Sequence, residues 1–267
     1  MILLVALAWV SIDCRVAIAE HPDEDSTAKK DLHLFLLVGQ SNMAGRGKLT
    51  PTDKIAHPRV WMLGKDHRWT PAIDPMHFDK PVAGVGLGRT FGICIADADS
   101  EIHVGLIPCA VGGSPIDSWE PGGYHHQTKS HPYGDALMRA KIALKSGTLK
   151  GILWHQGESD SKPILAEAYE LKLHTLIDRF RRDLQATDVP FIAGQMGQFD
   201  ERPWSDEKKR VDAAHRGLPD RIPFTAFVAS DGLAHGGDEV HFSADCYREF
   251  GRRFANAYHR LTGRSRP

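Results

Sequence analysis

The first candidate catalytic residue of this sequence is a serine at the end of an apolar segment. Ser41 follows the apolar run 33–38 in the turn Gly39-Gln40-Ser41, where a buried strand would pass into a helix. A hydroxyl in this position is held clear of the backbone, and N–H groups at a helix N-terminus favour a developing oxyanion. Ser41 is therefore a candidate nucleophile, although a serine at a helix start is commonly only an N-cap.

Asp238 and His241 stand three residues apart near the end of the chain. In a turn, this spacing lets the carboxylate accept the imidazole N–H and fix the tautomer, so that the other ring nitrogen can act as a base. The chain has 15 histidines, so this pair becomes informative only together with Ser41. The three side chains predict a serine nucleophile with His241 as its base and Asp238 as the acid that orients it.

Two further apolar runs end in hydrogen-bond donors. Gly112 and Gly113 follow the run 102–109, and glycines there let backbone N–H groups approach a ligand closely. Gln156 follows the run 151–155 and carries a side-chain amide. The N–H of Ser41, the N–H of Gly112 or Gly113 and the amide of Gln156 would form a three-donor oxyanion hole. A plain glycine turn and a helix cap would also explain these residues.

Short apolar runs alternate with amphipathic segments along most of the chain, and these elements must position the candidate residues. The runs are apolar on both faces and often bounded by Gly or Pro, which is typical of strands buried in a parallel sheet. Helices are expected at 132–146, 162–185 and 244–261, and the stretch 61–88 reads as a long connection. The alternation predicts an α/β domain with helices on both faces of a mostly parallel sheet, whose ligands bind beyond the carboxyl ends of the strands. The strands are expected at 33–38, 59–63, 102–109, 151–155, 191–195 and 224–229.

Composition and charge exclude several classes of partner. With 33 basic and 34 acidic residues the formal net charge is -1, so no strong field attracts nucleic acid or anionic lipid. Removal of an N-terminal signal peptide would leave three of the 4 cysteines, an odd number that argues against a disulfide framework. No pair has CxxC spacing, which argues against a zinc or redox site.

The N-terminal segment has the pattern of a secretory signal. An apolar run ends in Ala17-Ile18-Ala19 and gives way to an acidic stretch, although no Lys or Arg precedes it. The run is too short for a stable membrane span. We expect a signal peptide at 1–19, a polar linker at 20–31 and a single domain with the candidate residues at 32–267, in a secreted or periplasmic protein.

Four ordered segments of this sequence resemble the SGNH hydrolase superfamily, in its sialate O-acetylesterase and acetylxylan esterase branch, carbohydrate esterase family six. The resemblance spans about residues 32–260 and implies a three-layer α/β/α, flavodoxin-like fold, no cofactor or metal, and hydrolysis of acetyl esters on a glycan. It implies Ser41 as nucleophile, His241 as base, Asp238 as triad acid, and Gly113 and Gln156 as oxyanion donors. The segments are Gly39-Gln40-Ser41-Asn42-Met43, Gly112-Gly113-Ser114, Trp154-His155-Gln156-Gly157-Glu158-Ser159-Asp160 and Asp238-Glu239-Val240-His241.

Other residues are candidates for contact with an acetylated glycan. Gln40 and Trp119 are expected to bind substrate, and Trp119 or Tyr124 could stack on a sugar face, although aromatic residues in loops often only cap a core. The histidines 125, 126 and 131 look like metal ligands, but their Gly, Pro and Lys surroundings indicate a solvated loop.

The hypothesis is thus acyl transfer through a covalent acetyl-enzyme, followed by release of acetate by water. Two rivals are another short-chain esterase or lipase on the same fold, and a secreted carbohydrate-binding protein that has lost turnover.

Overall fold

The computed structural model describes residues 31–263. The expected signal peptide and residues 20–30 of the expected linker lie outside this range. A seven-stranded sheet runs through the described part of the chain, in the order β3-β2-β4-β1-β5-β6-β7. Neighbouring strands are parallel except β2 and β3. The predicted mostly parallel α/β fold is confirmed. The strands are β1 (Leu32–Gly39), β2 (Val60–Leu63), β3 (Trp69–Pro71), β4 (Val104–Pro108), β5 (Gly147–His155), β6 (Phe191–Gly194) and β7 (Thr225–Val228).

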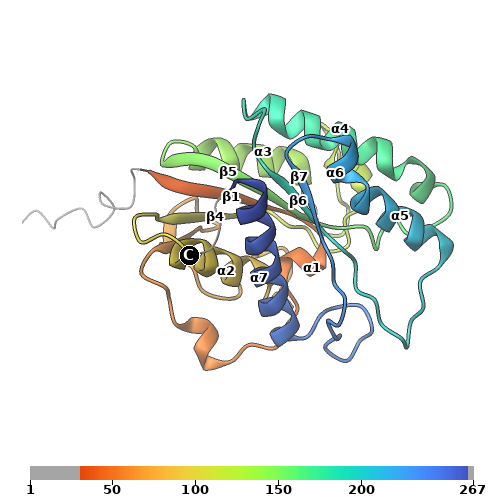
Figure 1. The fold of residues 1–267 in the computed structure, drawn as a ribbon, viewed down its shortest axis with the longest axis horizontal. Coiled ribbons are helices and arrows are strands. Elements are labelled where there is room, and N and C mark those ends of the chain that lie inside the picture. Colours follow the sequence, from red (N-terminus) through yellow and green to blue (C-terminus); the bar gives the residue numbers. More distant parts are fainter. Residues whose placement is uncertain (1–30, 264–267) are drawn as a thin grey trace, which may run out of the picture.

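Helices connect the strands and form the two outer layers. Figure 1 shows α2 and α7 on one face of the sheet and α3, α4, α5 and α6 on the other. None of the helices within 31–263 is long and apolar enough to span a membrane. The helices are α1 (Ser41–Ala44), α2 (Leu87–Asp97), α3 (Pro132–Ala143), α4 (Leu165–Asp183), α5 (Asp206–Arg216), α6 (Leu218–Arg221) and α7 (Ala244–Leu261), with 3-10 turns at Pro51–Lys54 and Ile116–Trp119.

The side chains of β1 divide between two hydrophobic cores, as strand alternation requires. Leu34, Leu36 and Val38 pack with α3 and α4 on one face, whereas Phe35 and Leu37 pack with α2 and α7 on the other. All five side chains are fully buried. A strand apolar on both faces is the form that a sheet covered by two helical layers needs.

The parallel pairing brings the ends of β1, β4 and β5 to the same edge of the sheet. Gly39 at the end of β1 lies opposite His155 at the end of β5, and the N–H of Val111, beyond β4, donates to the carbonyl oxygen of Gly39 at 2.9 Å. A side chain at Gly39 would collide with the backbone carbonyl of His155, so only glycine allows this close approach. The residues that follow these strands therefore meet at one site.

Candidate active site

Ser41 is the first residue of α1 and lies where β1 turns into that helix. Its side chain faces the loop before α7, and Oγ lies 2.9 Å from Nε2 of His241. These residues are 200 positions apart in the chain. A serine hydroxyl at this distance from an imidazole nitrogen can pass its proton to that nitrogen during attack on a carbonyl.

Asp238 holds the other side of the imidazole ring. Its Oδ2 lies 2.6 Å from Nδ1 of His241, and its Oδ1 accepts the backbone N–H groups of Val240 and His241. Partial burial opposes the charge on this carboxylate, but the N–H groups outweigh it and lower the pKa of Asp238 to about 2. An ionised Asp238 requires a proton on Nδ1, so Nε2 is left to accept the proton of Ser41.

Two backbone N–H groups beside Ser41 are available to an oxyanion. Among residues 31–263, no acceptor lies within hydrogen-bond distance of the N–H of Ser41 or of Gly113. The N–H of Gly112, by contrast, donates to Oδ2 of Asp79 at 2.8 Å. Gly113 has a φ of 84°, a conformation that glycine adopts readily. Of the two glycines, the geometry favours Gly113 as the donor.

Gln156 does not meet the prediction that it donates to the oxyanion. Its side chain is fully buried, and its Nε2 donates to the backbone carbonyl of Ser114 at 3.1 Å and to Oδ2 of Asp160. Its Oε1 accepts the hydroxyl of Tyr169 at 2.7 Å. Both amide hydrogens are therefore used inside the protein. Since Ser114 follows Gly113, the amide braces the glycine turn.

The residues expected to bind substrate have structural contacts instead. Trp119 is fully buried, donates its Nε1–H to Oγ of Ser114 at 2.9 Å and packs edge-on against Trp154. It is a core residue, and the prediction that it stacks on a sugar is wrong. Gln40 is buried as well, and its Oε1 accepts the N–H of Ser159 at 3.3 Å.

Tyr124 is the exposed aromatic residue of the loop that follows Trp119. It packs against the rings of His126 and His131 at 4.9 and 5.0 Å, whereas His125 is buried and bonds Thr128. Within residues 31–263 no three His, Cys, Asp or Glu side chains form a group that could hold a metal ion. The three histidines of this loop therefore do not form a shared metal site.

Asn42 is a residue of the site that sequence reasoning missed. Its Nδ2 donates to Oε1 of Glu158 at 2.6 Å and to the carbonyl of Val240 at 3.1 Å. Its Oδ1 accepts the hydroxyl of Tyr247 at 2.6 Å and the N–H of Phe242 at 3.4 Å. One fully buried amide therefore holds the peptide groups on both sides of His241. Its position after Ser41 is the signal that could have identified it.

The comparisons with known protein sequences identify the family of this chain. A family model described as carbohydrate esterase, sialic acid-specific acetylesterase, matches residues 31–260. A protein of Arabidopsis thaliana described as a probable carbohydrate esterase is 32% identical over 251 residues, covering 84% of this chain and 89% of the relative.

Solved structures show the same fold. The structure of an Arabidopsis thaliana protein superposes with a TM-score of 0.75 and 31% identity, covering 85% of this chain and 98% of the other. The structure of NanS superposes with a TM-score of 0.72 and 18% identity, covering 89% of this chain and 99% of the other. A carbohydrate acetylesterase from Xanthomonas citri gives 0.67 at 18% identity, over 87% of this chain and 57% of the other.

Proposed function

This chain belongs to the carbohydrate esterase family of sialic acid-specific acetylesterases, and we propose that it removes O-acetyl groups from carbohydrate through Ser41, His241 and Asp238. It is a carboxylic ester hydrolase by this membership. The observation that carries the assignment of residues is the continuous chain of contacts from Ser41 Oγ to His241 Nε2 and from His241 Nδ1 to Asp238.

The proposed reaction has two acyl-transfer steps. Oγ of Ser41 attacks the acetyl carbonyl while Nε2 of His241 takes the hydroxyl proton, and the same nitrogen returns that proton to the departing sugar oxygen. Water, deprotonated by Nε2, then attacks the acetyl-serine and releases acetate. Asp238 keeps the imidazole in the required tautomer and stabilises its positive charge in both steps.

The negative charge on the carbonyl oxygen is proposed to rest on backbone donors. The N–H groups of Ser41 and Gly113 are free to receive it, whereas both amide hydrogens of Gln156 are bound to the protein. Preorganised N–H groups lower the barrier because they need no rearrangement as the charge develops. Gln156 would then act indirectly, since it holds the carbonyl group of Ser114 next to Gly113.

The direct test is acetate release by the purified protein and its variants. Ser41→Ala and His241→Ala are each expected to lose nearly all activity on an acetylated oligosaccharide, up to about a millionfold. Ser100→Ala, in an exposed turn, and His174→Ala, at a half-buried position of α4, serve as matched controls that should keep activity. Circular dichroism would verify that all four variants are folded. Turnover close to wild type in Ser41→Ala would refute the proposed nucleophile.

A further inference from the structure

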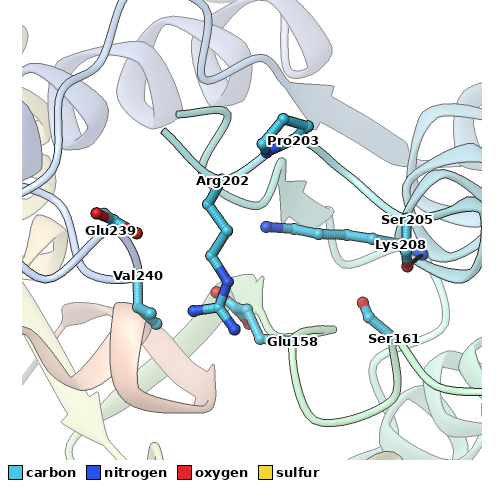
Figure 2. Close-up of a pocket in the computed structure, with 8 residues that line it drawn as sticks. All are labelled: Glu158, Ser161, Arg202, Pro203, Ser205, Lys208, Glu239 and Val240. Atoms are coloured by element: carbon cyan, nitrogen blue, oxygen red, sulfur yellow. Dashed lines mark hydrogen bonds between the residues drawn. The ribbon is translucent and has the colours of Figure 1, made fainter. Parts of the chain in front are cut away.

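A pocket of about 250 Å³ lies next to the residues that carry the triad, and the proposed reaction does not use it. It is formed by the loop after β5, the loop before α5 with the first turn of α5, and the loop that leads to His241. Figure 2 shows Arg202 extending from its loop toward Glu158, with Lys208 reaching into the same space and Glu239 on the opposite side. Its walls are Glu158, Ser161, Arg202, Pro203, Ser205, Lys208, Glu239 and Val240.

The pocket shares its wall with the catalytic turn. Glu158 and the carbonyl of Val240 both accept from Nδ2 of Asn42, at 2.6 and 3.1 Å. Asn42 follows Ser41 in the chain, and Val240 precedes His241. Glu239 and Val240, which line the pocket, are the two residues between Asp238 and His241, so the pocket lies directly beside the triad.

One guanidinium and one carboxylate oxygen in the pocket lack partners within the described part of the chain. The exposed side chain of Arg202 makes no hydrogen bond or ion pair with residues 31–263, and Oε2 of Glu158 is buried without a hydrogen bond. Lys208 is held in place, since its Nζ donates to the carbonyl of Gly197 at 3.1 Å and lies over the ring of Trp204. The buried carboxylate oxygen lacks a hydrogen bond that buried polar atoms normally have, and the exposed guanidinium is free to donate to a ligand in the pocket.

The mixture of charges selects the chemistry of the occupant. A carboxylate in this pocket would be repelled by Glu158 and Glu239, and an ammonium group by Arg202 and Lys208. A hydroxyl group donates to a carboxylate and accepts from a guanidinium at the same time. Pro203 and Val240 add an apolar surface for the C–H face of a ring.

We propose that this pocket binds uncharged hydroxyl groups of the sugar whose acetyl ester lies at Ser41. Arg202 donates to these hydroxyls and the exposed carboxylate of Glu239 accepts from them. The inference rests on the proposed function, because it assigns a place to the leaving group of that reaction.

The test compares two acetyl esters of different size. For wild type and Arg202→Met, kcat/KM is measured on an acetylated neutral oligosaccharide and on p-nitrophenyl acetate, and the ratio of the two values is taken. The ratio is expected to fall about tenfold in Arg202→Met, mainly through KM on the oligosaccharide, because a hydrogen bond from a charged donor is lost. Arg210→Met, an exposed substitution on α5 that faces Glu167, should keep the wild-type ratio.

Other outcomes separate this inference from the function on which it rests. Wild-type protein that releases no acetate from the oligosaccharide would overturn the proposed function itself. An active wild type with an unchanged ratio in Arg202→Met would overturn only the assignment of the pocket. If Arg202→Met lowers kcat/KM only on an acetylated sugar that bears a carboxylate, the pocket binds an acidic sugar instead, and the assignment to uncharged hydroxyls is overturned. Lys80 lies next to Gly113, where its Nζ donates to Oε1 of Gln127 at 2.8 Å. A fall of the ratio in Lys80→Met but not in Arg202→Met would place the sugar beside Gly113 and overturn the assignment of the pocket.

Discussion

Asp238 controls the protonation of His241 through its own charge. With a pKa lowered to about 2 it is ionised at neutral pH, and Oδ2 accepts from Nδ1 at 2.6 Å. In Asp238→Asn the amide would present an N–H to Nδ1 and favour the opposite tautomer. We expect kcat/KM on an acetyl ester to fall by up to about ten-thousandfold, with the fold intact.

Two other aspartates near strand ends serve as comparisons for Asp238→Asn. Oδ1 of Asp231 accepts from Nε2 of Gln198 at 3.1 Å, and Asp160 accepts from Gln156 and from the N–H of Ile116. Asp231→Asn and Asp160→Asn should act mainly through stability or loop order, because neither carboxylate bonds His241. A nearly normal Asp238→Asn beside an inactive Asp231→Asn would reverse the assignment of the triad acid.

Residues whose roles depend on local geometry could be predicted from sequence, and those with distant partners could not. Asp238 and His241 meet within a single turn, so their spacing alone predicted the contact. Gln156 follows β5 and Trp119 ends the 3-10 turn Ile116–Trp119, but both side chains turn inward and bond Ser114. The hydrogen bond from the buried amide of Gln156 to the carbonyl of Ser114 depends on how distant segments pack together. A local sequence pattern contains no information about that packing.

At the scale of elements, Asn42 connects α1 to the loop that carries His241. If the amide is removed, Val240 and Phe242 lose the hydrogen bonds that fix the peptide groups around the base. In Asn42→Ala we expect kcat to fall about a hundredfold while KM changes little, because a small displacement of the base disturbs the transition state more than binding. Steady-state kinetics on p-nitrophenyl acetate measure both constants.

The control for this prediction is Asn256→Ala, an exposed substitution on α7. Tyr247→Phe removes one of the hydrogen bonds to Oδ1 of Asn42 and should give a smaller loss of kcat than Asn42→Ala. Equal kcat in Asn42→Ala and Asn256→Ala would show that the loop keeps its position without the amide.

Elements with a strong pattern of their own were predicted well. The apolar run 33–38 became β1, and the expected helices at 132–146, 162–185 and 244–261 became α3, α4 and α7 with shifts of a few residues at their ends.

The helices α2 and α5 and the strand β3 lacked a clear hydrophobic pattern. α2 contains Gly88 and Gly92, which disfavour a helix locally but allow close packing against Leu37 and Leu106. α5 is mostly charged, with Val211 and Ala214 as its buried apolar residues. β3 has 3 residues at the sheet edge, too few for a period to show, and lies within the stretch expected as a connection.

For the whole molecule, buried titratable groups set the response to acid. Burial lowers the pKa of His155, lowers that of His77 to about 4 and lowers that of His215 to about 3. Each histidine is neutral in the folded state and gains a proton in the unfolded chain below about pH 6.5, so its contribution to stability is lost as the pH falls. Asp74 and Asp160 act in the opposite direction, because burial raises their pKa values to about 7 and about 6.

Asp74 allows a direct test of this opposite pH dependence of stability. Burial is the largest cause of its raised pKa; nearby Arg89 opposes the shift and Asp53 adds to it, and Oδ1 has no hydrogen-bond partner within residues 31–263. Since the folded-state pKa lies above the unfolded value, its favourable contribution is complete below about pH 4 and is lost as the pH rises toward 7. Asp74→Asn keeps the shape of the side chain but cannot ionise.

The variant should therefore gain stability relative to wild type as the pH rises from 4.5 to 8, on the order of 1 kcal/mol for each pH unit up to about 7. Urea unfolding of both proteins at several pH values measures this difference directly. Asp188→Asn, at an exposed loop position, should follow the wild-type curve. Parallel curves for wild type and Asp74→Asn would mean that this carboxyl ionises in the folded protein as readily as in the unfolded chain.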